Sequence, residues 1–304
     1  MGFTKLMTVR TAGQAWLLQV EQDDDRKALA RWLGPWAASP RPSPDGDDLA
    51  ALARGEGCAG VVTMAAVPKE RIPPPAPAGP SRNPPVHPAL IPTAEGLAAF
   101  SDYYGISFGT SEGMERATVE YVKGSERSAA RAAFRLLVMR RVFAGGGIVL
   151  HSTSVKTERG LLVFAGPSGA GKTTAALTFP VERRLDPDIV LLVERGGSWV
   201  RLDHFDEYKP RNFAPGPAAG IPVRAVLLPG AGNAFDLRFI DGAEAVAACV
   251  HVLSPAMSGG GPAGVAGSIE RAERLARSAK VARFRWSLAE DRDDLPRLIE
   301  DALG

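Results

Sequence analysis

The residues best suited to chemistry form the stretch GPSGAGKTT at 166–174, which fits the pattern G-x-x-x-x-G-K-[ST]. A chain that wraps its N–H groups around a polyphosphate needs small side chains and permissive backbone angles, and glycine supplies both. In this pattern Lys172 reaches the β and γ oxygens, and the Thr173 hydroxyl ligates Mg²⁺. The expected phosphate-contacting residues are Gly166, Ser168, Gly169, Ala170, Gly171, Lys172, Thr173 and Thr174.

The surroundings of this loop agree with phosphate binding. The apolar run LLVFA precedes it and the helix-compatible TAAL follows, which is the strand, loop and helix order that the motif requires. The alternative is an ordinary glycine turn between a strand and a helix. An ordinary turn does not explain a lysine placed directly after the third glycine, so we predict a nucleotide-phosphate site.

Two aspartates follow the loop. Asp186 and Asp188, in RLDPDIVLLV, come 14 and 16 residues after Lys172, where the next apolar strand begins. Mg²⁺ prefers oxygen ligands, and an attacking hydroxyl needs a base. The alternative interpretation is a strand cap with a solvated carboxylate. Beside a phosphate loop, we expect at least one of the two to serve the metal or the nucleophile.

A histidine precedes the loop. His151 ends the strand-like IVLH, 15 positions before Gly166, so two adjacent strands would bring its ring beside the loop. Histidine is the residue type best suited to proton transfer near neutral pH. A hydrogen-bonded structural histidine is the alternative interpretation.

The strands and helices that position these residues can be predicted from apolar runs and from the spacing of apolar residues. Strands are expected at 148–151, 160–165, 188–193, 199–202, 222–229, 235–240 and 282–288. Helices are expected at 125–144, 241–253, 268–280 and 295–303. The third strand starts at Asp188, and the helix at 241–253 begins with Asp241 and Glu244 at capping-box spacing.

The N-terminal part predicts a small α+β region at 1–67, with strands at 8–21 and 57–67 and a short helix at 24–36 between them. Residues 68–92 are rich in proline and predict an extended connector, with a docking site for a proline-recognising domain as the alternative. The remaining residues, 93–304, are expected to form the nucleotide-binding domain, with its core at 145–255.

Composition excludes several functional classes. The 304 residues carry 36 basic and 34 acidic side chains, a net charge of +2, which implies no general attraction to nucleic acid or to an anionic membrane. Cys58 and Cys249 lie far apart, which excludes a thiolate metal site and favours free thiols in a reducing compartment. The sequence has no signal peptide and no apolar stretch of membrane-spanning length, so a soluble cytoplasmic protein is expected.

A family resemblance emerges from the motifs together. The histidine, the G-x-S-G-x-G-K-[ST] loop, a short helix and a strand entry close to L-S-D-D-I-V-L-L resemble the HPr kinase/phosphorylase family and related HPr-kinase-like enzymes. The resemblance covers Ile148 to Val193 and extends more loosely to Leu253. It implies an α/β fold with the phosphate-loop core of the HPr-kinase and phosphoenolpyruvate-carboxykinase type and a mixed sheet, preceded by a smaller α+β region.

The resemblance also implies roles. Lys172 would bind phosphate, Thr173 and Asp188 would hold Mg²⁺, and His151 would stand in the catalytic centre. Where the family has two adjacent aspartates, this chain has Pro187 followed by Asp188. Either Asp186 has taken the role of the base from a shifted position, or phosphoryl transfer is impaired.

Two functions follow. The first is an ATP- and Mg²⁺-dependent kinase that transfers a phosphoryl group to a hydroxyl, expected to be serine, of a protein or peptide. The second is a nucleotide-binding scaffold or sensor of the same fold without transfer. No N-K-x-D signature for guanine accompanies the loop. The acceptor, the base and the oligomeric state, a homo-oligomer included, stay open.

Overall fold

The computed structural model describes residues 5–11, 14–20, 24, 27, 29, 58–72, 90–93, 96–111, 114–202, 213, 220–253, 262–289 and 291–304. Its contacts divide the chain into two compact units, and the division falls between Arg141 and Val142. The first unit therefore takes in residues 93–141, which the sequence analysis had placed with the nucleotide-binding domain.

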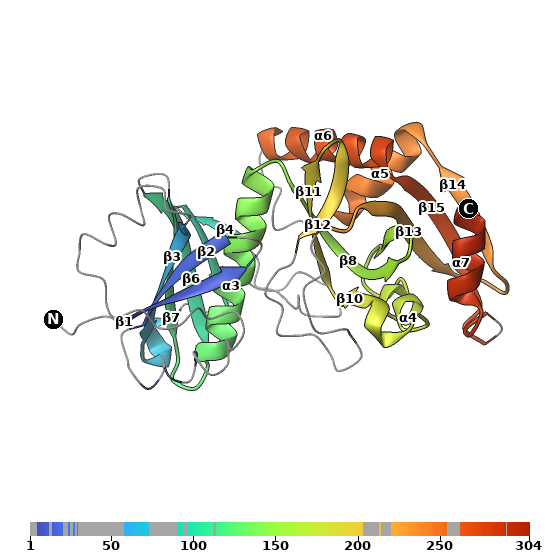
Figure 1. Cartoon of the computed structure of the whole chain (residues 1–304). Coiled ribbons are helices and arrows are strands. Elements are labelled where there is room, and N and C mark those ends of the chain that lie inside the picture. The colour runs from blue at the N-terminus through green and yellow to red at the C-terminus, as the bar shows by residue number, and fades with distance from the viewer. Residues whose placement is uncertain are drawn as a thin grey trace. The chain divides into compact units, whose positions relative to one another are not determined.

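The described part of the first unit forms a seven-stranded sheet in the order β1-β2-β3-β7-β6-β5-β4 (Figure 1). Its strands are β1 (Lys5–Thr11), β2 (Gln14–Val20), β3 (Cys58–Ala66), β4 (Leu90–Thr93), β5 (Gly96–Phe100), β6 (Tyr104–Ser111) and β7 (Met114–Tyr121). Strand β3 is parallel to both of its neighbours, β2 and β7, and the other adjacent pairs are antiparallel. Strands near the start of the chain therefore pair with strands some fifty residues later.

Helix α3 (Glu126–Ala144) confirms the helix predicted at 125–144. Phe134 and Leu137 of this helix are fully buried. Arg140 donates to Glu115 of β7 at 3.4 Å and lies over the Phe108 ring of β6, 5.7 Å from its centroid. These contacts place the helix on the face of the first sheet.

The N-terminal predictions have mixed outcomes. The segment predicted as one strand at 8–21 is a hairpin of β1 and β2, with Lys5 paired to Val20. Asp24, Lys27 and Leu29 are helical, and the rest of the predicted helix lies outside the described residues. The proline-rich segment begins with the short helix η2 (Lys69–Arg71), while most of it also lies outside the described residues.

The second unit is built on a mixed eight-stranded sheet in the order β12-β11-β8-β9-β13-β15-β14, with β10 paired to β8. Its strands are β8 (Ile148–Thr157), β9 (Gly160–Ala165), β10 (Arg184–Asp186), β11 (Ile189–Arg195), β12 (Ser198–Leu202), β13 (Val223–Ala231), β14 (Asp236–Ile240) and β15 (Lys280–Trp286). Strands β9, β13 and β15 are parallel, and the other pairs are antiparallel. The mixed α/β architecture predicted from the sequence is therefore confirmed.

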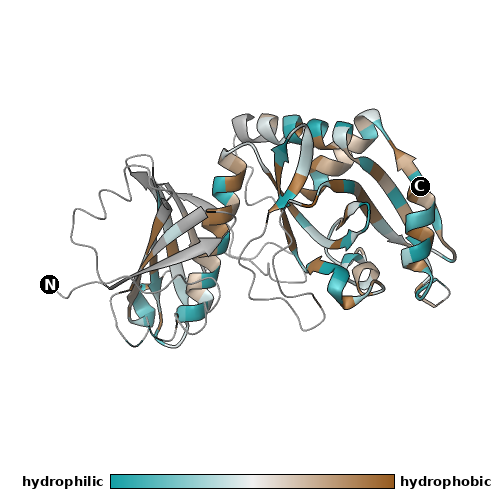
Figure 2. Cartoon of the chain, viewed as in Figure 1, coloured by the Kyte–Doolittle hydropathy of each residue, from teal (hydrophilic) through white to brown (hydrophobic). Residues whose placement is uncertain are grey.

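Helices cover both faces of this sheet (Figure 1). Its helices are α4 (Lys172–Ala176), η3 (Val181–Arg183), α5 (Gly242–Val252), α6 (Pro262–Ser278) and α7 (Leu295–Leu303). Leu161 and Val163 of β9 pack in the apolar cluster under α5 and α6, while Leu162 and Phe164 pack with α4 and α7. Figure 2 shows apolar residues along the central strands and polar residues on α6 and α7. The unit is a three-layer α/β/α structure.

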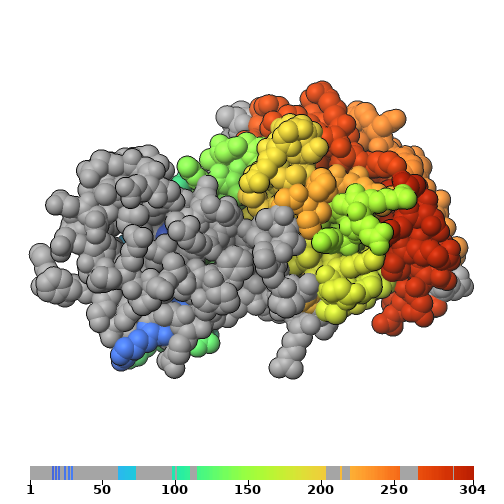
Figure 3. All heavy atoms as spheres, in the orientation of Figure 1, coloured from blue at the N-terminus to red at the C-terminus, as the bar shows by residue number. Residues whose placement is uncertain are grey.

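A side-chain hydrogen bond joins η3 to α7 on the surface of the second unit. Arg183 Nη1 donates to Glu300 Oε1 at 3.5 Å, and the two segments lie side by side in the space-filling view (Figure 3).

No helix in the described part of the chain is long and apolar enough to cross a membrane.

Candidate functional site

The glycine-rich loop leaves the carboxyl end of β9, the strand between β8 and β13 in the second sheet. Its backbone angle φ is +152° at Gly166, +81° at Gly169 and +89° at Gly171. Residues with a Cβ rarely adopt these angles, so the curvature of the loop requires glycine at these positions. Gly171 is also the N-cap of α4.

Lys172 lies against the start of its own loop. Its side chain is buried, and its Nζ donates to the carbonyl oxygens of Gly166 at 2.8 Å and Pro167 at 2.9 Å. Burial lowers the pKa of Lys172, and the negative charge of Asp188 acts in the opposite direction. The ammonium group of Lys172 therefore lies at the start of the loop, close enough for the charge of Asp188 to act on it.

Helix α4 after the loop is short, at five residues. Such a helix contributes only a small dipole, so the loop amides and Lys172 must provide most of the attraction for an anion. Thr173 and Thr174 are exposed at its beginning. Both side chains are therefore accessible to solvent next to the loop.

His151 and Asp188 form a pair one strand away from the loop. His151 lies on β8, the neighbour of β9, and Asp188 directly precedes β11, whose Ile189 is opposite His151 in the antiparallel register. The His151 Nε2 and Asp188 Oδ1 atoms are 3.1 Å apart, and the two side chains are 41% and 30% exposed. The Asp188 carboxylate can therefore orient the His151 ring, and the ring stays accessible to a group that donates a proton.

Asp186 has the opposite environment. Its carboxylate is completely buried and accepts hydrogen bonds from Arg201 Nε at 2.6 Å and Arg201 Nη2 at 2.7 Å. The Ser154 hydroxyl donates to the same carboxylate at 2.5 Å. A carboxylate whose charge is matched by a buried, bidentate guanidinium is suited to anchoring the chain.

Three consecutive residues of β8 hold the segment that carries both aspartates. The Ser152 amide donates to the Asp188 carbonyl at 2.9 Å, and the Thr153 hydroxyl donates to the Pro187 carbonyl at 3.1 Å. With the bond from Ser154 to Asp186, residues 186–188 are tied to β8 along their whole length. The position of Asp188 beside His151 is therefore set by the backbone as well as by its side chain.

Arg201, the partner of Asp186, was missed by the sequence analysis. It belongs to β12, and its side chain is 1% exposed. An arginine inside the apolar strand WVRL is the signal that could have revealed it, because a buried guanidinium requires a buried partner.

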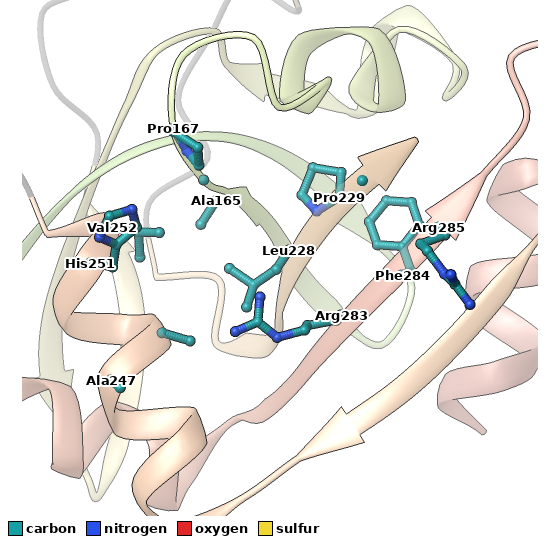
Figure 4. A pocket seen from close by; sticks show the side chains of 13 residues that line it. Ala165, Pro167, Leu228, Pro229, Ala247, His251, Val252, Arg283, Phe284 and Arg285 are labelled. Carbon is teal, nitrogen blue, oxygen red and sulfur yellow. The ribbon is translucent and has the colours of Figure 1, made fainter. Parts of the chain in front are cut away.

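A pocket of about 540 Å³ opens beside the start of the loop (Figure 4). Gly166 and Pro167 form one wall, and the ends of β13 and β15 form another. The last turn of α5 closes it on a third side with His251 and Val252. The pocket was not predicted from the sequence, because its walls come from four separate elements.

The donor set limits the kind of metal that this site can hold. No group of three or more histidine, cysteine, aspartate or glutamate side chains in the described part of the chain could hold a metal ion. Mg²⁺ commonly uses only one or two carboxylates and takes its other ligands from water and substrate phosphates. Asp188 and the Thr173 hydroxyl are oxygen donors of the type that Mg²⁺ uses.

Comparisons with known proteins add no family assignment. No protein-family model matches the chain, and the curated proteins include no significant relative.

Proposed function

We propose that the second unit is an ATP- and Mg²⁺-dependent kinase with the phosphate-loop core of the HPr-kinase and phosphoenolpyruvate-carboxykinase type. It transfers the γ-phosphoryl group to a hydroxyl, expected to be serine, of a protein or peptide. The observation that carries the proposal is that His151 lies on β8, the strand next to the one that leads into the loop, and that Asp188 is paired with it. A phosphate cradle, a cation and a group able to accept a proton thus lie together.

The loop and Lys172 bind the phosphates in this proposal. The glycines turn the loop so that its amides can surround an anion, and Lys172 brings a positive charge to the same place. Phosphoryl transfer needs mainly positioning and charge stabilisation from the protein. Both are available from the loop without any covalent step by the enzyme.

Thr173 and Asp188 hold the metal. Mg²⁺, when bound there with the nucleotide, neutralises charge on the β and γ oxygens. Thr173 offers a hydroxyl at the start of α4, and Asp188 offers a partly exposed carboxylate whose charge acts on Lys172. Asp188 thereby links the metal to the imidazole of His151.

His151 accepts the proton of the attacking hydroxyl. The sequence left this role to Asp186 or His151, and the two differ in access: the His151 side chain is 41% exposed, whereas that of Asp186 is buried against Arg201. A general base must come within hydrogen-bond reach of the proton that it removes. The geometry favours His151 as the base and Asp186 as the anchor of the segment.

A nucleotide sensor without transfer is the second candidate. The observation that favours it is Pro187, which stands where the related kinases have the first of two aspartates. Both candidates bind ATP through Lys172, and only the kinase transfers phosphate.

The test compares two lysines. Lys172→Ala removes the cation in the loop, and Lys156→Ala removes an exposed lysine of β8 as a matched control. ATP binding with Mg²⁺ is measured by calorimetry, and transfer is measured with γ-labelled ATP and a library of serine-containing peptides. We expect Lys172→Ala alone to abolish ATP binding and any transfer.

Each outcome has a distinct meaning. Binding and transfer that both depend on Lys172 support the kinase, and binding without transfer to any peptide supports the sensor. The proposal is wrong if the unaltered protein does not bind ATP, or if Lys172→Ala binds it as well as the unaltered protein does.

A further inference from the structure

We infer that Arg184 is a positioning residue of the proposed site. It ties the end of α4 to the strand that leads to Asp188, and so keeps Thr173 and Asp188 at a fixed spacing for the Mg²⁺ that arrives with the nucleotide. The inference rests on the proposed function and adds to it a residue that acts only through the placement of these two oxygen donors.

The guanidinium of Arg184 holds two carbonyl groups at the end of α4. Its Nε donates to the Phe179 oxygen at 2.6 Å, and its Nη2 donates to the Leu177 oxygen at 2.8 Å. Leu177 is the C-cap of α4, where helix carbonyls have no partner in a following turn. A basic side chain is favourable at this end of a helix. These two bonds join α4 to β10, which lies beside it (Figure 1).

Helix α4 is too short to keep its position by itself. It has five residues, and isolated helices shorter than about 12–15 residues are only marginally stable in water. The Phe179 ring is fully buried and lies 5.9 Å from the Phe164 ring of β9, centroid to centroid. The ring therefore fixes the end of the segment to the sheet, and Arg184 fixes its backbone to β10.

One turn of helix separates this contact from Thr173. The Leu177 amide donates to the Thr173 carbonyl at 2.9 Å, while the Leu177 carbonyl accepts the bond from Arg184. A shift of Leu177 therefore moves Thr173 through both the covalent turn and this hydrogen bond.

Arg184 belongs to the same anchored strand as Asp186. Arg184 pairs with Val155 of β8, and the Asp186 carboxylate is bound by Arg201. Asp188 follows in the same segment, and its carbonyl accepts a backbone bond from β8. The segment that places Asp188 is thus fixed to the sheet, and Arg184 connects α4 to this fixed segment.

The phosphate loop closes on itself without Arg184. The Lys172 Nζ donates to the carbonyls of Gly166 and Pro167, within the same loop. Loss of Arg184 should therefore spare the loop and displace the helix that carries Thr173. In the proposed function the loop binds phosphate with or without metal, whereas the spacing of Thr173 and Asp188 matters only when Mg²⁺ is present.

The neighbouring arginine is a matched control because it binds elsewhere. Arg183 Nη1 donates to Glu300 Oε1 of α7 at 3.5 Å, and Arg183 Nη2 lies 4.0 Å from Glu158 Oε1. Arg183→Met therefore removes the same charge one position away and leaves the contacts of Arg184 with α4 in place.

The experiment measures how much Mg²⁺ strengthens ATP binding. The variants are Arg184→Met, Arg184→Lys and Arg183→Met in the full chain. Calorimetry gives the dissociation constant for ATP with Mg²⁺ and with EDTA, and the ratio of the two constants is the magnesium gain. The melting temperature of each variant is measured in the absence of ligand.

We expect Arg184→Met to reduce the magnesium gain by about tenfold, as is typical when a residue that orients metal ligands is lost. ATP affinity in EDTA should stay within about twofold, because the loop and Lys172 are unchanged. Arg184→Lys should give an intermediate gain, since an ammonium group lacks the planar fork that reaches two carbonyls. Arg183→Met should leave the gain unchanged.

A purely structural role of Arg184 gives a different result. The magnesium gain compares two states of the same folded protein, so a contribution to stability alone lowers the melting temperature and leaves the gain unchanged. Such a result for Arg184→Met overturns the inference. An equal loss of ATP affinity with and without Mg²⁺ also overturns it, because Arg184 then supports the whole loop.

The remaining outcomes separate this inference from the proposed function. If Arg184→Met does not fold, Arg184→Lys decides, and a gain equal to that of the unaltered protein overturns the inference. If the unaltered protein binds ATP without any gain from Mg²⁺, the metal assignment and this inference fail, while phosphate binding at the loop stands. If it does not bind ATP, the proposed function fails, and this inference fails with it.

Discussion

Asp186 and Asp188 lie on either side of Pro187 and have opposite surroundings. Asp186 is buried, with its carboxylate bound by Arg201 and Ser154. Asp188 is 30% exposed and lies 3.1 Å from the His151 ring. The two residues are of the same type and follow the same loop, but only Asp188 is accessible from solvent. Burial with a matched charge makes one aspartate an anchor and leaves the other available for chemistry.

The strands explain the difference. Asp186 ends β10 and pairs with Ser154 of β8, whereas Ile189, just after Asp188, pairs with His151 of the same strand. The register shifts between Arg184 and Asp186, and Pro187 stands between the two pairings. One aspartate is thus directed toward the arginine of β12 and the other toward the histidine of β8.

The largest expected effect is on catalysis at Asp188. Asp188→Asn keeps the shape of the side chain and removes the charge that lies against His151 and that, in the proposed function, holds Mg²⁺. We expect the rate of phosphoryl transfer to fall by about 10²- to 10⁴-fold, with stability changed by less than about 0.5 kcal/mol. Single-turnover transfer from γ-labelled ATP and urea unfolding measure the two quantities. A large loss of stability with little loss of transfer would contradict the comparison.

The next effect is on stability at Asp186. Asp186→Asn or Arg201→Met leaves a buried charge without its partner, so we expect a loss of about 3–5 kcal/mol in the free energy of unfolding. The double variant Asp186→Leu with Arg201→Met should recover part of this loss, because no lone charge remains.

The control for that prediction is a surface ion pair. Arg285 and Asp236 are 3.1 Å apart, with side chains 67% and 60% exposed. Arg285→Met should cost about 0–1 kcal/mol, since exposed pairs contribute little. If the two arginine variants lose the same stability in urea, the buried pair is not an anchor.

A smaller effect concerns the pH dependence of ATP binding. Burial lowers the pKa of Lys172, so its ammonium is lost at a lower pH than that of an ordinary lysine, and ATP affinity should fall as the pH rises through this pKa. The fall is up to about tenfold per pH unit for a single proton. The charge of Asp188 raises the pKa, so Asp188→Asn should move the fall to lower pH. Calorimetric titrations from neutral to alkaline pH measure the ATP affinity. If Lys172→Ala shows the same pH dependence as the unaltered protein, Lys172 is not the group responsible.

The smallest effect is expected for the hydroxyl of Thr153, which donates to the Pro187 carbonyl at 3.1 Å between the two aspartates. Thr153→Val keeps the shape and removes this bond, which should cost about 0.5–1.5 kcal/mol and leave the Arg201 pair intact. Unfolding in urea gives the stability, and the transfer rate shows whether Asp188 has shifted. No change in either would mean that the backbone bond from Ser152 is sufficient.

Much of the second unit could be predicted because its signals are local. Apolar runs define β9 and β11, and glycines mark the loop where the backbone adopts positive φ angles. The sequence also indicated that His151 lies on a strand adjacent to β9, and this is confirmed, although β8 continues to Thr157 and does not end at His151 as predicted. The start of α6 was predicted at 268 and lies at Pro262. Helix ends are weak signals, because several residue types are compatible with them.

The first unit was harder to predict. The sequence analysis ended the N-terminal region at residue 67, yet β3 pairs with β7, which begins at Met114. A parallel pairing between distant segments leaves no mark on either segment alone, since each strand shows only its own apolar pattern. The domain boundary depends on this pairing, so it could not be placed from local patterns.

The sequence by itself determined the residue types, the loop with its lysine and the strands around it, because these depend on neighbours within a few positions. Only the tertiary structure decided the roles of the two aspartates and the existence of the pocket beside the loop. Arg201 reaches Asp186 through the pairing of separate strands, and the pocket is made by β9, β13, β15 and α5 together. Burial and charge compensation belong to the folded chain, so the difference between the buried carboxylate of Asp186 and the accessible one of Asp188 appears only when the strands pair.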